Sequence, residues 1–175
     1  MITARPVFHR CVGVTTVAVA LAATSGCTVP VDAVAGISVT ADGSLLGVMM
    51  VCGHKIEGAT LYVDSDDVNK AVTARSWTAD RPLAASLTTW PLAHPATGWT
   101  PTRPLTPLTP NTAYALYGWT KDNAWSSSSV SFTLRDRDQL RPGEVRYDKT
   151  SANGDASPAT VPMTEFKATA CRLRG

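Results

Sequence analysis

The chain has 175 residues, and its 16 Lys and Arg against 14 Asp and Glu give a formal net charge of +2. Arg5 and Arg10 account for that excess, so 14 basic residues face 14 acidic ones from Cys27 onward. Over positions 135–148 the two signs interleave, which is typical of a solvated face. A nucleic-acid binder needs a basic patch, so the charge pattern argues against nucleic acid as a partner.

The first 27 residues have the three parts of a secretory signal. Two arginines precede an apolar run over Val12–Ala23, which is shorter than the roughly 20 residues that a membrane-spanning helix needs. The small residues at 24–26 then lead directly to Cys27. This order resembles the signal peptide of bacterial lipoproteins, and the resemblance implies cleavage before Cys27 and a lipid on that cysteine.

The lipoprotein resemblance also implies a location, outside the cytoplasmic membrane and anchored to it by lipid. Residues 1–26 are then the signal peptide, 27–35 a lipidated tether and 36–175 a single domain. An arginine-rich, lysine-poor composition with much Ala, Thr and Val makes the whole chain similar to uncharacterised lipoproteins of actinobacteria. Two alternatives stay open: ordinary cleavage near Ala22 or Ala23, which releases a soluble secreted protein, and an uncleaved anchor.

Four cysteines are present. If Cys11 leaves with the signal peptide and Cys27 carries lipid, Cys52 and Cys171 remain as a pair in an oxidising compartment. We expect a disulfide between them that closes nearly the whole domain. A thiol pair for metal or redox chemistry is the alternative, but neither cysteine has C-x-x-C spacing.

Strand patterns dominate the first part of the domain. Ile37 and Val39 alternate with polar residues, and Asp42-Gly43 is typical of a hairpin turn. The run 44–52 is apolar on both parities, which indicates a buried central strand. Residues 59–63 predict a third strand.

The middle of the chain is less regular. A polar loop is expected at 64–70, followed by shorter strands near 72–78 and 87–90. Residues 91–110 hold six of the 12 prolines. Because proline lacks the N–H that a strand ladder needs, we expect a long irregular crossing there.

The segment 108–114 (LTPNTAY) resembles the entry to strand F of fibronectin type III domains, whose pattern is Leu-x-Pro-x-Thr-x-Tyr. The resemblance implies that Tyr114 packs inward and bonds back to nearby backbone, as a tyrosine corner. A hairpin of strands at 114–120 and 128–134 should follow. We therefore expect an all-β fold, an immunoglobulin or fibronectin III-like antiparallel β-sandwich.

The C-terminal part exceeds what such a sandwich needs. After a turn at 141–144, residues 145–147 predict a short strand and 150–162 an exposed, turn-rich segment. Residues 163–171 alternate, with Phe166, Ala168 and Ala170 on one face, and predict an extra C-terminal strand. Cys171 has the opposite parity from Phe166, so the strand must end or bulge before it.

No sequence motif specifies catalysis. After processing, His54 and His94 remain, without His-x-x-x-His spacing, and no Gly-x-Ser-x-Gly or Ser-x-x-Lys nucleophile motif is present. His54 is expected to be an ordinary loop histidine. Asp64, Asp66 and Asp67 are a weak candidate for calcium, because the Gly and Glu of an EF-hand loop are missing. No cofactor is expected.

Tryptophan is the more useful functional signal, since the chain has five. A sandwich core uses one or two, so others are free to bind sugars, peptides or proteins. The opposing interpretation is that these rings cover sandwich edges beneath long loops. The candidate binding aromatics are Trp90, Trp99, Trp119 and Trp125.

These observations favour a lipid-anchored, extracytoplasmic β-sandwich that acts without catalysis, as a binding or accessory module. Its expected partners are the membrane, through the lipid, and an envelope component or another protein. One alternative is a hydrolase that acts on envelope material and uses His54 or a carboxylate pair. The other is a soluble secreted protein.

Overall fold

The computed structural model describes residues 28–65, 72–151 and 153–172. These residues contain eleven strands and two short helices. The strands are β1 (Val31–Val39), β2 (Leu45–Val51), β3 (Ile56–Val63), β4 (Val72–Leu83), β5 (Leu87–Pro91), β6 (Trp99–Pro101), β7 (Tyr114–Trp119), β8 (Ser126–Ser128), β9 (Val130–Phe132), β10 (Glu144–Thr150) and β11 (Ala156–Pro162). The helices are α1 (Leu134–Gln139) and α2 (Met163–Thr169), and no helix among the described residues is long and apolar enough to cross a membrane.

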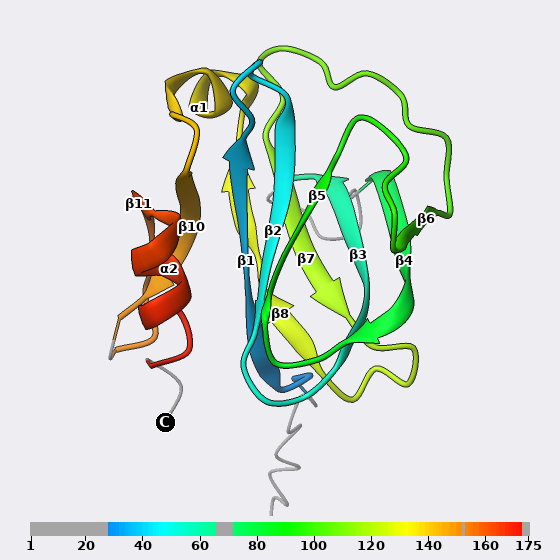
Figure 1. Cartoon of the computed structure of the whole chain (residues 1–175), viewed down its shortest axis with the longest axis vertical. Coiled ribbons are helices and arrows are strands. Elements are labelled where there is room, and N and C mark those ends of the chain that lie inside the picture. Colours follow the sequence, from blue (N-terminus) through cyan, green and yellow to red (C-terminus); the bar gives the residue numbers. More distant parts are fainter. Residues whose placement is uncertain (1–27, 66–71, 152, 173–175) are drawn as a thin grey trace, which may run out of the picture.

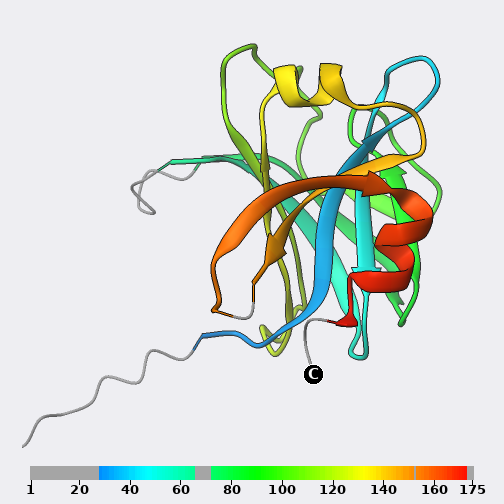
Figure 2. The same ribbon diagram turned by 90° about the vertical axis from the view of Figure 1, so that its left-hand side faces the viewer.

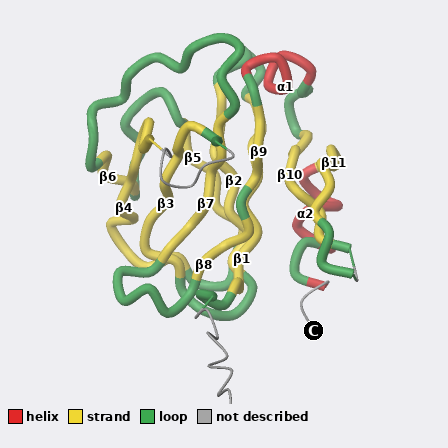
Figure 3. The backbone as a smooth tube through the Cα atoms, turned by 180° about the vertical axis from the view of Figure 1, so that it is seen from behind, coloured by secondary structure: helices red, strands yellow, loops and turns green. Residues whose placement is uncertain are grey.

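The strands form one continuous sheet that folds over into two facing arms (Figure 1). In the first arm, β5, β2 and β1 pair antiparallel. In the second arm, β6, β4, β3, β7 and β9 pair antiparallel in that order, and Figure 3 shows this arm from behind. The short strand β8 pairs parallel with β1 and antiparallel with β7, and so joins the arms. The all-β, sandwich-like prediction is confirmed.

Three tryptophans fill the space between the arms. Trp90 and Trp99 stack with ring centroids 4.2 Å apart, Trp77 meets Trp90 edge-on, and all three are at most 4% exposed. Gly47 lies opposite Trp90 in the β2–β5 pairing, where a Cβ would come within 2.6 Å of the ring. The prediction that Trp90 and Trp99 are exposed binding aromatics is therefore wrong, because both rings pack inward and fill the core.

Residues 163–171 do not form the predicted last strand, since Met163–Thr169 is the helix α2. Phe166 and Ala170, one helical turn apart, are both buried, so burial follows the helical period. The segment predicted as exposed turns contains β11, which is mostly exposed but pairs with β10 along its whole length. The additional C-terminal strands are thus β10 and β11.

Together, β10, β11 and α2 form a layer that we call the C-terminal cap. It lies over the outer face of β1 and β2, and Figure 2 shows it in front of these strands. The cap and the sandwich pack against each other through a second apolar cluster of buried residues, namely Val34, Val48, Val145, Tyr147, Phe166 and Ala170.

Strand β1 begins at Val31, so the domain starts earlier than the predicted position 36. Ala33 and Ala35 are fully buried between the arms. On the other face of β1, a Cβ at Gly36 would come within 2.7 Å of Val145 in the cap. The small residues of β1 therefore belong to the packed domain. Of the expected tether 27–35, residues 31–35 lie in β1, and the described residues that precede the strand are 28–30.

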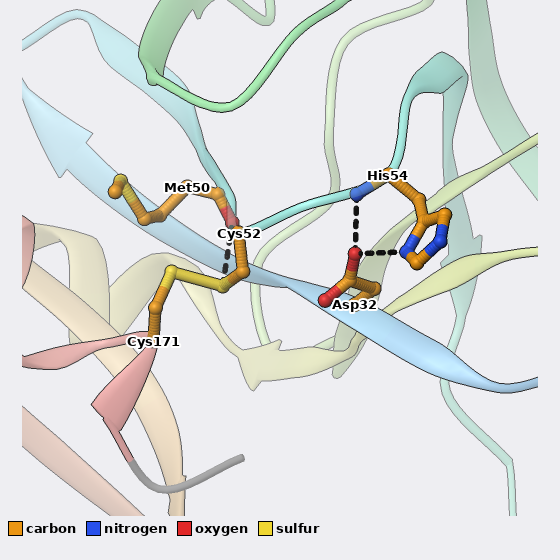
Figure 4. Close-up of a disulfide and its surroundings, with 5 residues drawn as sticks. All are labelled: Asp32, Met50, Cys52, His54 and Cys171. Atoms are coloured by element: carbon orange, nitrogen blue, oxygen red, sulfur yellow. Dashed lines mark hydrogen bonds and ion pairs between the residues drawn. A yellow bond between two sulfur atoms is a disulfide. The ribbon is translucent and has the colours of Figure 1, made fainter. Parts of the chain in front are cut away.

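The predicted disulfide between Cys52 and Cys171 is confirmed. Its Cα atoms lie 5.5 Å apart although the two cysteines are 119 positions apart in sequence. Cys52 follows β2 and Cys171 follows α2, so the bond fastens the end of the cap to the sandwich (Figure 4).

The proline-rich crossing is held by buried polar contacts. Arg75 on β4 is 4% exposed and donates from its guanidinium to the carbonyls of Leu92 and Thr106, at both ends of the crossing. Burial lowers the pKa of Arg75 from its ordinary value. Nearby, the hydroxyl of Tyr114 accepts a 2.9 Å hydrogen bond from the backbone N–H of Thr109, the contact expected of a tyrosine corner.

Replacing both Cys52 and Cys171 by Ala should lower the free energy of unfolding by about 4–5 kcal/mol, because a loop of this length regains much entropy when the bond is absent. Urea denaturation of the mature chain measures this change. Wild type under a reducing agent is the control and should match the variant. An unchanged midpoint would contradict the stabilising role of the bond.

Tyr114→Phe should lower the free energy of unfolding by about 1 kcal/mol, because the N–H of Thr109 loses its acceptor in a partly buried place. Tyr117→Phe on the same strand is the matched control and should change stability by less than about 0.5 kcal/mol. Equal effects of the two substitutions in chemical denaturation would refute the tyrosine-corner role.

Candidate functional site

Aromatic side chains gather on the outer surface of the second arm, on β3 and β7. Because strand residues alternate between faces, Leu61 and Leu116 point into the core while their neighbours Tyr62 and Tyr117 point outward. The Tyr62 and Tyr117 rings meet edge-on with centroids 5.9 Å apart. Trp119 continues this row along β7. We call Tyr62, Tyr117 and Trp119 the aromatic face.

The Trp119 indole is held in one place. It lies over Gly58 of β3, where a Cβ would come within 2.3 Å of the ring, so only glycine leaves room for it. Its Nε1–H donates a 2.9 Å hydrogen bond to the hydroxyl of Thr60. That hydroxyl lies 3.2 Å from the hydroxyl of Ser76. Gly58, Thr60 and Ser76 thus fix Trp119 flat against the sheet.

A groove of about 630 Å³ runs along the aromatic face. Four hydroxyl-bearing residues also line it, namely Thr60, Thr73, Ser126 and Ser129. Asp64 is the one charged residue among the described residues of its lining, and it accepts a 2.8 Å hydrogen bond from the Ser131 hydroxyl. The groove therefore offers flat rings and hydroxyl groups, with little charge.

The Tyr62 hydroxyl stays neutral over a wide pH range. Burial raises its pKa from the ordinary value, and the nearby charge of Asp64 raises it further. A neutral phenol can both donate and accept a hydrogen bond, so Tyr62 adds a ring and a polar group to the groove.

The calcium hypothesis gains no support from the described residues. Asp64 is bound by Ser131, while Asp66 and Asp67 lie outside the described residues. Within residues 28–65, 72–151 and 153–172, no group of three or more His, Cys, Asp or Glu could hold a metal ion.

His54 belongs to a second cluster, beside the disulfide at the start of β1 (Figure 4). Its Nδ1 lies 2.6 Å from a carboxylate oxygen of Asp32, and its backbone N–H donates to the same oxygen. Its ring also stacks on Trp125, with centroids 3.5 Å apart. His54 is thus not the ordinary loop histidine that the sequence predicts, because it ties the turn after β2 to β1 and to the turn after β7.

Electrostatics reinforce this second cluster. Burial opposes the charged form of Asp32, but the hydrogen bonds and positive charge offered by His54, with a hydrogen bond from the Gly53 backbone, outweigh it. The pKa of the Asp32 carboxyl therefore lies below its ordinary value. The His54 ring is hydrogen-bonded to Asp32 and stacked on Trp125, and no hydroxyl or thiol of the described residues is hydrogen-bonded to it.

The structure thus separates the four tryptophans predicted to bind. Trp90 and Trp99 lie in the core, Trp119 lies on the aromatic face, and Trp125 stacks on His54. Sequence reasoning missed Tyr62 and Tyr117. Their alternation with buried leucines was the available signal, because it gives them the outward parity of Trp119.

Asp32→Asn should destabilise the protein by about 1 kcal/mol at pH 7, because a charge-assisted pair with His54 is lost. A lowered folded-state pKa gives stability that is present above the unfolded pKa and is lost as pH falls through the folded pKa. The difference in the free energy of unfolding between Asp32→Asn and wild type should therefore shrink below pH 3.8, the ordinary pKa of an aspartate carboxyl.

Urea denaturation of both proteins between pH 7 and pH 2 measures this difference. Asp138→Asn removes an exposed carboxylate on α1 and is the matched control, expected to change stability little at any pH. If the difference in the free energy of unfolding between Asp32→Asn and wild type stayed constant down to pH 2, the lowered pKa of Asp32 would be contradicted.

Comparison of the chain with protein-family models, with curated proteins and with solved structures finds no match. Its function must therefore be inferred from the chemistry of the aromatic face and of the His54 cluster.

Proposed function

We propose that this chain is a lipid-anchored, extracytoplasmic binding module that holds a neutral glycan of the cell envelope against its aromatic face. The observation that carries the proposal is the row of three outward rings, Tyr62, Tyr117 and Trp119, in a groove lined by hydroxyl groups. An immunoglobulin-like sandwich is the proposed scaffold, supported by the pairing order of the two arms and by the Tyr114 contact.

The ring geometry suits sugars. The C–H-rich face of a hexose packs on a flat aromatic ring, which is an apolar body that carries a polar edge in Tyr and Trp. Trp119 is already immobilised by Gly58 and Thr60, so little side-chain entropy is lost when a ligand binds. A rigid platform of this kind favours binding of a preformed, extended chain.

The polar lining suits sugars as well. Glycan hydroxyls donate and accept in turn, and Ser and Thr hydroxyls do the same. An ionic ligand would need compensating charge, whereas Asp64 is the one charged residue among the described residues lining the groove. The groove chemistry therefore favours a neutral polysaccharide over an acidic one or a nucleic acid.

The anchor sets the location of this binding. It rests on the lipoprotein-like N-terminus that ends at Cys27. Since β1 begins at Val31, the four intervening steps span at most about 14 Å, at about 3.5 Å per residue. A domain so close to its anchor would meet envelope polymers near the membrane surface, either alone or as an accessory to another protein.

Catalysis is less well supported than binding. A glycoside hydrolase needs two carboxyl groups flanking the scissile bond, and the aromatic groove has Asp64 alone among its described lining residues. His54 and Asp32 do not line that groove. Both observations favour binding without turnover.

Trp119→Ala and Tyr117→Ala should each weaken glycan binding about three- to tenfold, because each removes one stacking ring. The measurement is titration of the mature chain with soluble mannan, galactan and cellohexaose, read by tryptophan fluorescence and calorimetry. Trp125→Ala, a partly buried tryptophan outside the groove, is the matched control and should keep wild-type affinity.

Two results would contradict the proposal. One is the absence of binding to every neutral glycan tested, with heparin bound instead. The other is equal loss of affinity in Trp119→Ala and Trp125→Ala, since that would mean that fold stability rather than stacking is measured.

A further inference from the structure

The C-terminal cap encloses a second groove, of about 660 Å³, on the other side of β8 from the aromatic face. It lies between the start of β1, the strands β10 and β11, and α2. Its volume falls within the range of roughly 300–1,000 Å³ that is typical of small-molecule sites. This groove plays no part in the proposed glycan binding.

The groove exists because β10 leaves the sandwich. Strand β10 pairs with β1 only at Gly36 and Ile37. Toward its beginning, β1 pairs instead with β8, through Val31, Ala33 and Val34. The rest of β10 arches away together with β11, as Figure 2 shows, and the space beneath the arch stays open.

The groove is preformed. One wall is the sandwich itself, and the other is fixed by the disulfide directly after Ala170 and by the buried Phe166 of α2. A ligand would therefore enter without first ordering the cap, which lowers the entropic cost of binding.

The apolar part of its lining consists of five aliphatic residues and the ring of Tyr147. The five aliphatic residues are Val31, Val34, Ala159, Val161 and Ala170. This lining differs from the aromatic face, because it offers no row of flat rings and matches a flexible alkyl chain instead. Each methylene removed from water adds to the affinity for such a chain.

Polar and charged residues also line the groove. Two basic residues, Lys149 and Arg172, and two acidic ones, Asp148 and Glu165, line the groove, so the formal charges of its described lining residues balance. Ser128 also lines it, and its hydroxyl is buried without a hydrogen-bond partner among the described residues. A zwitterionic head group matches balanced charge better than an anionic one does.

The position of Val31 at the exposed side of the groove indicates where such a ligand would come from. Val31 lines it and is 45% exposed, which is unusual for a large apolar side chain next to a folded core. Val31 is also the first residue of β1, four residues after Cys27. The groove would therefore open within about 14 Å of the anchor point, at about 3.5 Å per residue.

From these observations we infer that the cap groove binds one acyl chain of a zwitterionic membrane lipid. The inferred distance to the bilayer rests on the proposed anchor at Cys27. The acyl-chain site itself rests on the groove, and it is independent of the glycan site.

The test uses the mature chain from residue 27 with Cys27→Ser, titrated with fluorescent lysophosphatidylcholine below its critical micelle concentration. This chain, with its groove unaltered, should bind lysophosphatidylcholine saturably and with one-to-one stoichiometry. Val31→Asp at the mouth and Ala159→Trp within the groove should each weaken binding at least tenfold. Val72→Asp is the matched control, because Val72 is an exposed valine on β4, away from the cap.

Three results would overturn the inference. The first is equal binding by Val31→Asp and Val72→Asp. The second is binding that appears only above the critical micelle concentration, which would mean adsorption to micelles. The third is binding by a chain that ends at Arg172 but not by the full chain, which would mean that the last residues of the chain occupy the groove.

Two further measurements separate this inference from the proposed function. Trp119→Ala should keep full lysophosphatidylcholine affinity, so loss of glycan binding and loss of lipid binding are distinguishable. Intact mass of the native protein tests the anchor by itself, as a lipid-sized increment on a chain that begins at Cys27.

Discussion

Strand β1 is buried on both faces, and the arrangement of the rest of the molecule depends on this. From Ala33 to Val39 every residue is buried, with alternate side chains in the main core and under the cap. A two-layer sandwich would leave the second face in water, so the chain needs a third layer, which β10, β11 and α2 provide. The Cys52–Cys171 bond holds this short cap there by reducing the entropy that the chain gains when the cap is released.

The sequence predicts the sandwich better than it predicts the cap. Alternation and turn signals locate β2, β3 and β7, and the segment before Tyr114 predicts its inward packing. Residues 163–171 fit two periods at once, since Phe166, Ala168 and Ala170 alternate while Phe166 and Ala170 are also one helical turn apart. The odd parity of Cys171 was the evidence against a strand. Tertiary packing decides whether such a short segment is helix or strand. The seven-residue helix gains its stability from burying Phe166 and little from its own backbone.

The candidate site shows a different limit of sequence reasoning. Parity indicates which residues of a strand share a face, but it does not say which face is covered. Trp90 directly precedes the irregular crossing and Trp99 lies within it, so no pattern shows that Arg75 holds that crossing over the core and encloses the two rings. Tyr62 and Tyr117 were open to prediction, because each sits beside a leucine in an apolar strand. The pairing of Asp32 with His54, 22 positions apart, depends on how β1 and β2 lie together, and no local pattern encodes it.

The two grooves share one wall, the short strand β8, and its composition explains how both stay open. Ser126 and Ser127 face the aromatic groove, whereas Ser128 lines the cap groove. The serine side chain is too small to fill either groove. Its hydroxyl can also bond to backbone groups where the strand is irregular, as when the Ser127 hydroxyl accepts a hydrogen bond from the N–H of Gly118. Larger residues in this run would pack into one groove or the other. A serine run that carries no motif therefore has a physical role, since it joins the two arms and leaves a polar, unfilled surface on each side.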